Sequence, residues 1–357
     1  MTDAILKNEE RAVFALRSLY RRYGYTPYKM SRFEEYDLYV QNKDFLVSDQ
    51  VITFSDRSGR LLALKPDVTL SIVKNAPEEP GVVQKVYYNE NVYRDFREIM
   101  QTGLECVGDL SDYEIAEVVL LAARSLELLG KQFVLDISHV GLISAVLNSC
   151  ALGSRAKAQA MDCLRRKNSH ELKALCAGQE GAWKKLQCLA TCRGRGSEVL
   201  AQLQSIVTTV SERQALGELK GLWSILDSAG YGDSVRLDFS VGNDMRYYSG
   251  VVFKGYLPGI PTSVLSGGQY DRLPQKMGRR ARAIGFAIYV DLLQGGAGGA
   301  LDVDTVILHD GSVDAARLME AAQAAQKQGS VLVTRELPRE RVWRKLVRFE
   351  NGEAVES

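Results

Sequence analysis

The stretch Leu237 to Phe253 reads LDFSVGNDMRYYSGVVF and has the layout of one wall of a small-molecule pocket. A strand-like run, LDFSV, precedes a polar elbow, GNDMR, and two tyrosines and a second strand-like run follow it. Alternate strand positions would aim their side chains into such a pocket. Asn243 stands in the elbow, where a wall that binds an anion would need a positive charge. The pattern leaves open whether the pocket performs chemistry or only has the shape of one that did.

Metal and phosphate chemistry find little support in the remaining residues. Cys188 and Cys192 would share a helix face, and a zinc pair there is conceivable, but no CxxC motif supports it. The stretch RGRGS (193–197) lacks the GK[ST] ending of a phosphate loop, which favours a turn between helices. We therefore expect no metal site, no cofactor and reduced, mostly buried thiols. The three histidines stand far apart in the sequence, at His139, His170 and His309.

The composition is that of an ordinary soluble protein. The 357 residues are 46% hydrophobic and 25% charged, and they have room for two or three domains. A net charge of +1 and basic runs broken by acids argue against nucleic acid as a partner. The acidic residues in MTDAILKNEERAVFALRSLYRR argue against a signal peptide, and no run approaches the roughly 18 apolar residues of a membrane span. A cytoplasmic protein is the expectation.

Up to about Gly130 the sequence predicts mixed helices and strands. Helical spacing of apolar residues predicts an amphipathic first helix, with Val13, Leu16, Tyr20 and Tyr23 on one face. VITF and LLAL around the turn-rich SDRSGR predict a hairpin, and VVQKVYYNENVYR and FREIMQTGLECVG predict two more strands. A helix is expected from Asp112 to Leu129, ended by Gly130.

The pattern changes after the strand FVLDIS, which predicts four segments in all. Residues 140–230 are rich in Ala, Leu, Lys and Gln without a strand pattern, and they read as a helical insertion between two halves of one sheet domain, 1–139 and 231–293. Strands resume at VRLDFSV and continue to AIGFAIYV. QGGAGG is a linker by composition, and 300–357 is predicted to be a small β-α-β unit followed by a basic tail.

Four segments, taken in order, resemble the catalytic fold of class II aminoacyl-tRNA synthetases, and specifically the histidyl-tRNA synthetase branch. They are FSDRSGRLLALKPDVTLS, VYYNENVYRDFREIMQTGLECVG, NDMRYYSGVVF and SGGQYDRL…AIGFAIYVDLL. No single segment is specific, but their order and the insertion between the second and third are. The resemblance implies an α+β fold, an antiparallel sheet of six or seven strands flanked by helices, with the helical insertion and the small C-terminal unit added.

The resemblance also implies an amino-acid pocket. LKPDVT matches the family's LRPEGT, which places Asp67 and Thr69 against the α-amino group of histidine. A carboxylate suits an ammonium group, because the ammonium donates three charge-assisted hydrogen bonds. MQTGLE matches HQ-x-G-x-E, which places Gln101 in the pocket and lets Glu105 accept an imidazole N–H.

Three further residues belong to the same implied pocket. Tyr247 and Tyr248 match the paired tyrosines on the imidazole side, and Arg94 matches the motif 2 arginine that meets the α-phosphate of ATP. Taken singly, all these residues could also be satisfied polar groups and ordinary strand residues of a sheet. Their occurrence as a set in family order favours the pocket.

The departures from the family pattern concern the activation chemistry. The RG-LD-YY arginine, which compensates charge at the carboxylate being adenylated, is replaced by Asn243, and Arg246 stands at the family's Asp position. The arginine of GLER, which clamps ATP, is Leu292 here. Loss of one preorganised donor typically costs about 10²–10³ in rate, so adenylation is not expected.

The motif 2 loop is also short, because only two residues separate Arg94 from Arg97. Either the loop has been lost or the printed sequence lacks part of it. The C-terminal unit is likewise small for a complete anticodon-binding domain.

A synthetase-like fold with the histidine pocket kept and the activation residues gone resembles one family, the regulatory subunits of ATP phosphoribosyltransferase. The stretches DFSVGNDMRYYSGVVFKG and VLSGGQYDRL are similar to sequences of that family. The resemblance implies a non-catalytic partner of the short-form catalytic subunit, which performs the first step of histidine biosynthesis. It implies activation of that subunit, feedback inhibition with L-histidine as effector, and a homodimer within a larger hetero-oligomer. Histidine could bind the inherited pocket or the subunit interface.

Two other hypotheses remain. Arg94 and the pocket residues are compatible with a divergent histidyl-tRNA synthetase or another amino-acid-adenylating enzyme, which Asn243, Leu292 and the short loop oppose. A free-standing amino-acid sensor with some other partner is also compatible with the sequence.

Overall fold

The computed structural model divides the chain into two compact units, Met1–Gln294 and Gly295–Ser357. The structure describes residues 8–46, 50–77, 79–241, 247–293, 302–338, 341–350 and 353–356. The division runs through the predicted glycine-rich linker. The further division of the first unit into two core halves and an insertion stays a prediction, because that unit is compact as a whole.

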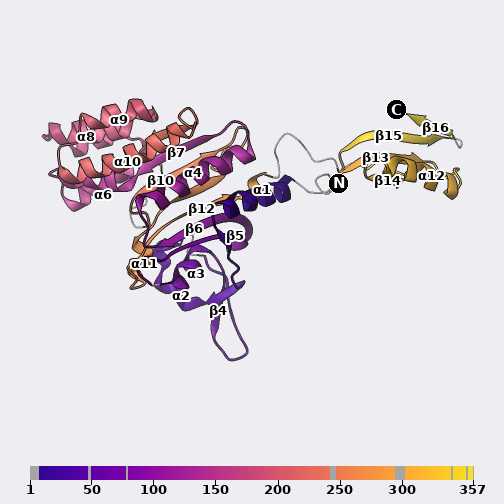
Figure 1. Ribbon diagram of the computed structural model, residues 1–357, viewed down its shortest axis with the longest axis horizontal. Coiled ribbons are helices and arrows are strands. Elements are labelled where there is room, and N and C mark those ends of the chain that lie inside the picture. Colours follow the sequence, from indigo (N-terminus) through magenta and orange to yellow (C-terminus); the bar gives the residue numbers. More distant parts are fainter. Residues whose placement is uncertain are drawn as a thin grey trace. The chain divides into compact units, whose positions relative to one another are not determined.

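A nine-stranded sheet is the framework of the first unit (Figure 1). Its order is β1-β5-β6-β12-β11-β10-β7-β9-β8, and neighbouring strands are antiparallel except for β1 with β5 and β7 with β9. The α+β class is confirmed, but the sheet is wider than the six or seven strands expected, because short strands extend both edges. The strands are β1 (Thr26–Pro27), β5 (Val83–Arg94), β6 (Arg97–Gly108), β7 (Val134–His139), β8 (Arg193–Arg195), β9 (Val235–Asp238), β10 (Val251–Tyr256), β11 (Leu265–Gln269) and β12 (Arg282–Tyr289).

Helices α1 (Asn8–Arg22) and α4 (Asp112–Leu129) cover one face of this sheet (Figure 1). The predicted bounds of α4 are confirmed, and α1 was predicted without bounds but ends one residue before Tyr23, which had been placed on its apolar face. Ser111 and Glu114 form a capping box at the start of α4, which satisfies backbone N–H groups that the first helical turn leaves free. Leu16 and Leu121 are fully buried in the hydrophobic core cluster that also contains Phe253 and Phe286 of the sheet. The opposite face of the sheet is left for a cavity.

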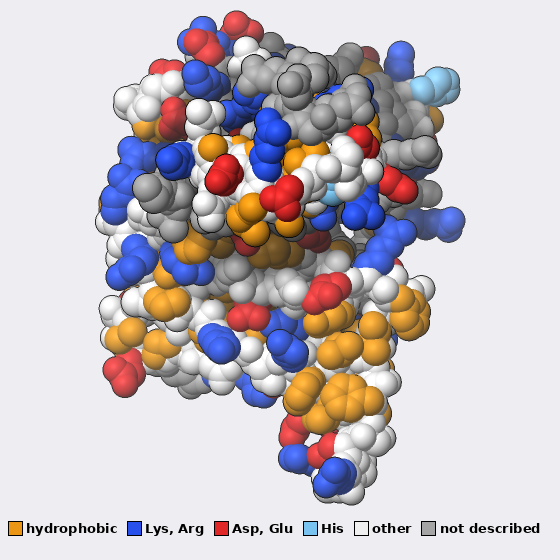
Figure 2. Space-filling view, turned by 90° about the vertical axis from the view of Figure 1, so that its right-hand side faces the viewer, with side chains coloured by type: hydrophobic (Ala, Val, Ile, Leu, Met, Phe, Trp, Pro, Cys, Tyr) orange, Lys and Arg blue, Asp and Glu red, His pale blue; other side chains and the backbone are white. Residues whose placement is uncertain are grey.

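A three-stranded sheet, β2-β4-β3, projects from the first unit and includes the predicted hairpin. Phe33, Phe54 and Leu61 are 45%, 39% and 45% exposed, and the two phenylalanine rings meet edge to face at 5.5 Å. Figure 2 shows hydrophobic side chains gathered on the projecting part at the bottom of the view. The elements here are β2 (Phe33–Glu35), α2 (Tyr36–Gln41), a 3-10 helix (Lys43–Phe45), β3 (Thr53–Ser55), β4 (Leu61–Leu64) and α3 (Thr69–Lys74).

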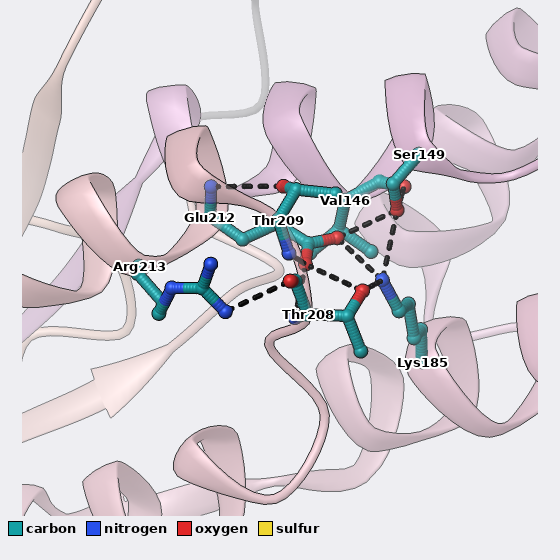
Figure 3. A network of polar contacts seen from close by, with 7 residues as sticks. All are labelled: Val146, Ser149, Lys185, Thr208, Thr209, Glu212 and Arg213. Atoms are coloured by element: carbon teal, nitrogen blue, oxygen red, sulfur yellow. Dashed lines mark hydrogen bonds and ion pairs between the residues drawn. The ribbon is translucent and has the colours of Figure 1, made fainter.

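Between β7 and β9 the chain is almost entirely helical, and a buried glutamate joins its helices (Figure 3). Glu212 Oε1 accepts hydrogen bonds from Ser149 Oγ and Lys185 Nζ, each at 2.6 Å. Its Oε2 accepts the backbone N–H groups of Thr208 at 2.6 Å and Thr209 at 2.9 Å. The helices are α5 (Val140–Ser149), α6 (Ser154–Arg166), α7 (Ser169–Leu175), α8 (Glu180–Thr191), α9 (Gly196–Gln204) and α10 (Val210–Ser228).

The stretch RGRGS was predicted to be a turn between helices, and this prediction is wrong. Arg193–Arg195 is not a turn but the edge strand β8, which pairs antiparallel with β9. Helix α9 begins at Gly196, where a Cβ atom would lie 2.1 Å from the Trp223 ring. Glycine is therefore required there by close packing, which a pattern of turn residues does not distinguish from a turn.

The second unit contains the predicted β-α-β unit, formed by β13 (Val303–His309), α12 (Ala315–Gln326) and β14 (Val331–Thr334), with the two strands parallel. The predicted basic tail is not a tail. It contains β15 (Trp343–Glu350), which pairs parallel with β13, and β16 (Glu353–Glu356), which pairs antiparallel with β15.

Candidate functional site

A cavity of about 610 Å³ lies over the sheet face opposite α4. It is lined by strands β5, β6, β10, β11 and β12, by the loop before α3 and by one residue of α6. Seven of the eight predicted site residues line it, and the eighth, Asn243, lies outside the described residues. The seven are Asp67, Thr69, Arg94, Gln101, Glu105, Tyr247 and Tyr248.

Glycines on the sheet give the cavity its depth. The register pairs Glu105 of β6 with Gly285 of β12, and Gly285 with Gly268 of β11. A Cβ atom at Gly285 would lie 1.6 Å from Glu105 Oε2, and one at Gly268 would lie 2.7 Å from the Tyr248 ring. These glycines were missed as site residues, although SGGQYD and AIGFA, which contain them, were among the matched segments.

Glu105 lies at the bottom of the cavity and is 2% exposed. Thr69 Oγ1 donates a hydrogen bond to its Oε1 at 2.7 Å, and the Tyr270 hydroxyl donates to its Oε2. Burial raises the pKa of Glu105 to about 8, although both hydrogen bonds lower it. Because no described residue places a cation beside it, the carboxyl group holds its proton at neutral pH. Tyr270 was not predicted as a site residue.

Asp67 and Arg94 form a second polar pair on the opposite side of the cavity from β10. Asp67 Oδ1 accepts the backbone N–H of Leu70 at 2.9 Å, and Arg94 Nη2 lies 3.5 Å from Asp67 Oδ2. Burial raises the pKa of Asp67, and the charge of Arg94 acts in the opposite direction. Arg94 Nε also donates to the Pro66 carbonyl at 2.6 Å. Arg94 therefore supports the loop that carries Asp67.

Gln101 supplies a donor that the described residues leave unused. Its side chain is 2% exposed, and Nε2 has no hydrogen-bond partner. An unpartnered buried amide costs roughly 1–3 kcal/mol, which an acceptor on a ligand would recover. The resemblance placed this residue in the pocket, and it lines the cavity.

Aromatic rings form the remaining wall. The Tyr247 ring lies 4.7 Å from that of Tyr248 and 5.7 Å from that of Tyr270, and Phe45 closes the group at 5.7 Å from Tyr247. Burial raises the pKa of Tyr247 and Tyr270 well above the ordinary value, so both hydroxyls stay neutral. This wall suits a flat, partly polar ring such as imidazole.

The motif 2 and motif 3 departures have structural counterparts. Arg94 pairs with Arg97 across a tight hairpin, and the two connecting residues, Asp95 and Phe96, have φ angles of 50° and 60°. Positive φ at both positions is the geometry of a type I′ turn. Leu292 packs against the main hydrophobic core, and Asp291 Oδ2 accepts the N–H of Met100 at 2.8 Å.

Within the described part of the chain, no group of three or more His, Cys, Asp or Glu side chains could hold a metal ion. All six cysteines are free thiols, and Cys188 is the one that is not buried. The search of the described helices for a segment long and apolar enough to cross a membrane finds none.

Comparisons with known proteins give the family. The family model of histidyl-tRNA synthetase matches residues 2–293 and so ends before the second unit. The ATP phosphoribosyltransferase regulatory subunit of Symbiobacterium thermophilum is 31% identical over 77% of this chain and 73% of the relative. The chain belongs to the family of ATP phosphoribosyltransferase regulatory subunits.

Solved structures agree with this family and fold. An ATP phosphoribosyltransferase regulatory subunit/histidyl-tRNA synthetase from Bacillus halodurans has a TM-score of 0.73 and 25% identity, over 92% of this chain and 88% of that one. A chain of the ATP phosphoribosyl transferase (HisG:HisZ) complex from Thermotoga maritima has a TM-score of 0.62 and 20% identity, over 78% of this chain and 96% of that one. The second likeness is one of fold.

Proposed function

We propose that this protein is a non-catalytic regulatory subunit that activates a short-form ATP phosphoribosyltransferase and makes it sensitive to feedback inhibition by histidine. The observation that carries the proposal is the cavity, in which Asp67, Gln101 and Glu105 surround a space of about 610 Å³ beside tyrosine rings. Membership in the regulatory-subunit family supports the partner. The protein would act in the cytoplasm, in the first step of histidine biosynthesis.

The cavity residues divide the recognition of histidine among them. Asp67 and Thr69 would bind the α-ammonium, Glu105 and Tyr270 would bind the imidazole, and Gln101 Nε2 would donate to an acceptor on the ligand. An imidazole that shares the proton of Glu105 offsets the cost of burying that carboxyl group. The site therefore has an electrostatic reason to favour histidine over an aliphatic amino acid.

Regulation would follow from differential affinity. Docking would stabilise an active arrangement of the catalytic subunits, and histidine would bind a less active arrangement more tightly. Linkage requires that the catalytic subunit then changes the affinity for histidine by the same factor by which histidine changes the affinity between the subunits.

Reconstitution tests the proposal. The purified full chain is mixed with the short-form catalytic subunit from the same source, and phosphoribosyl-ATP formation is followed with and without histidine. Activation that histidine reverses is expected for wild type, and activation without inhibition is expected for Glu105→Ala. No activation of a folded catalytic subunit would overturn the proposal. Inhibition that survives Glu105→Ala would move the effector site to the subunit interface.

Adenylation is the alternative, because Arg94 lines the cavity. Its guanidinium is engaged by Pro66 and Asp67, and the two other arginine positions hold Asn243 and Leu292. Histidine-dependent exchange of labelled pyrophosphate into ATP separates the two functions. Exchange above the rate without protein would overturn the non-catalytic part of the proposal.

A further inference from the structure

Among the described residues that line the cavity, one cation is not used by the fold itself. Among the described side chains that line it, three carry a positive charge: Arg94, Arg165 and Lys254. Arg94 is bound to Pro66 and Asp67. Arg165 of α6 is 60% exposed and pairs with Asp162 on its own helix at 2.6 Å. Lys254 of β10 is half-buried and makes no hydrogen bond or ion pair with a described residue.

The nearest acid does not explain Lys254. Asp136 of β7 is its cross-strand neighbour, but the cations that act on Asp136 are Arg193, Arg236 and Lys167. Asp136 Oδ1 has no hydrogen-bond partner. Lys254 is therefore a partly buried cation in the cavity wall that has no anion beside it among the described residues, and an anionic group on a ligand would supply that partner.

The sheet register shows that Lys254 points to the same face of the sheet as the amino-acid pocket, and that only small residues lie between them. Lys254 pairs with Ser266 of β11, Ser266 with Ala287 of β12, and Ala287 with Gly103 of β6. Residues paired in register point to the same face of the sheet. Small side chains therefore separate Lys254 from the strand that carries Gln101 and Glu105.

The distances allow one amino acid to span the space between Lys254 and Glu105. Three strand spacings of about 4.8 Å place β10 about 14 Å from β6. A lysine stem reaches roughly 6 Å, a charge-assisted hydrogen bond adds about 2.8 Å, and histidine measures roughly 6 Å from ring to carboxylate. Glu105 lies two residues along β6 from Gly103, so the diagonal from Lys254 to Glu105 is about 16 Å. The sum of the three lengths is about 15 Å, which is close to this diagonal when the imidazole lies above Glu105.

We propose that Lys254 binds the α-carboxylate of the amino acid in this cavity. This inference rests on the proposed histidine site and names the group that replaces the charge missing at Asn243. Asp67 would then hold the ammonium and Lys254 the carboxylate, so both charges of a zwitterion are matched from opposite sides of the cavity. The site would select amino acids over amines of the same shape.

The test is a cycle of two ligands and two variants of the full chain, measured by titration calorimetry. The ligands are histidine and histidinol, which has a hydroxymethyl group in place of the carboxylate. Lys254→Met is expected to weaken histidine binding about tenfold and to leave histidinol binding unchanged. Arg236→Met is the matched control. Asp136 pairs with Lys254 on one neighbouring strand and with Arg236 on the other, and Arg236 does not line the cavity.

The outcomes separate this inference from the proposed function. Equal losses for both ligands in Lys254→Met, or no loss for either, overturn the role of Lys254 and leave the histidine site standing. Binding of neither ligand by wild type overturns both. Lys254→Arg keeps the positive charge and is expected to retain the preference for histidine over histidinol. Loss of this preference in Lys254→Arg would also count against the proposal. The ratio of the two ligand affinities in wild type needs no variant to fold, and equal affinities would overturn the inference by themselves.

Discussion

Two buried glutamates, one in the helical segment and one in the cavity, have opposite electrostatic surroundings. Glu212 is fully buried, and four groups donate hydrogen bonds to it at 2.6–2.9 Å, one of them the Lys185 ammonium (Figure 3). Glu105 is equally inaccessible, but the described residues supply it with two hydroxyl donors and no cation. Burial would raise the pKa of Glu212, yet its donors lower that pKa to about 2, whereas burial raises the pKa of Glu105 to about 8.

The difference separates a structural carboxylate from a binding one. Three neighbouring segments donate hydrogen bonds to both oxygens of Glu212, so the carboxylate needs no donor from a ligand. Glu105 is held in its protonated form by burial, and a ligand that shares this proton can stabilise the carboxyl group. Burial of Glu105 lowers the stability of the protein, which is common at sites that bind a ligand.

The largest effect is expected from Glu212→Ala. The substitution leaves Lys185, which is 14% exposed, as an unpaired cation and removes the capping box of α10. We expect a loss of about 3–5 kcal/mol in the free energy of unfolding, measured by urea denaturation. Glu105→Gln is the comparison variant, with an expected loss below about 1 kcal/mol. Similar losses in the two variants would remove the distinction between the two sites.

Substitutions of Glu105 should affect histidine binding more than substitutions of Glu212, which is the reverse of their expected order for stability. Glu105→Ala removes the acceptor for the imidazole, and we expect histidine binding to fall about 100-fold or more by calorimetry. Glu212→Gln should leave the affinity of the folded protein for histidine unchanged, because Glu212 does not line the cavity. Unchanged affinity in Glu105→Ala would place the histidine site elsewhere.

The pH dependence of stability should differ in sign at the two residues. Folded Glu105 keeps a proton that the unfolded chain releases near pH 4.5, so its contribution is complete below that pH and is lost as the pH rises to about 8. The slope is about 1.4 kcal/mol per pH unit at most. Folded Glu212 has already lost its proton, so its contribution is complete above about pH 4.5 and is lost as the pH falls toward 2.

Urea denaturation at a series of pH values checks these slopes. Between pH 5 and 8, wild type should lose stability relative to Glu105→Gln, which has no titrating group there. Below about pH 4.5, wild type should lose stability relative to Glu212→Gln. Parallel curves for wild type and Glu105→Gln would contradict a raised pKa at Glu105.

The smallest effect is expected from Tyr270→Phe. The Tyr270 hydroxyl lowers the pKa of Glu105, so its removal should raise that pKa further, by about one unit or less. The midpoint of the pH dependence of histidine binding should move upward by the same amount. Tyr289→Phe is a control within the cavity, since the Tyr289 hydroxyl contacts Ser266 rather than Glu105. A downward shift in Tyr270→Phe would mean that this hydroxyl does not donate to the carboxylate.

Motif order was enough to predict seven residues that line one cavity, and their binding of histidine stays a prediction. Asp67, Thr69, Gln101 and Glu105 come from two matched segments, and they lie together because β6 and the loop before α3 are adjacent. Tyr270 and Gly285 were not predicted, because their roles depend on what stands opposite them in register. The partner of Arg94 was not predictable for the same reason. A guanidinium near a nucleotide site and one that holds a loop have the same place in a motif.

The amino-acid sequence by itself determined the order of most strands and helices, the family and seven of the residues around the cavity, because periodicity and motif spacing are local properties of the chain. Only the tertiary structure decided how charge is distributed among those residues. Whether a carboxyl group is buried beside a lysine, as Glu212 is, or beside two hydroxyls, as Glu105 is, depends on segments far apart in the sequence. The cost of burying charge is set by these distant neighbours, and so is the freedom of Lys254 to bind a ligand.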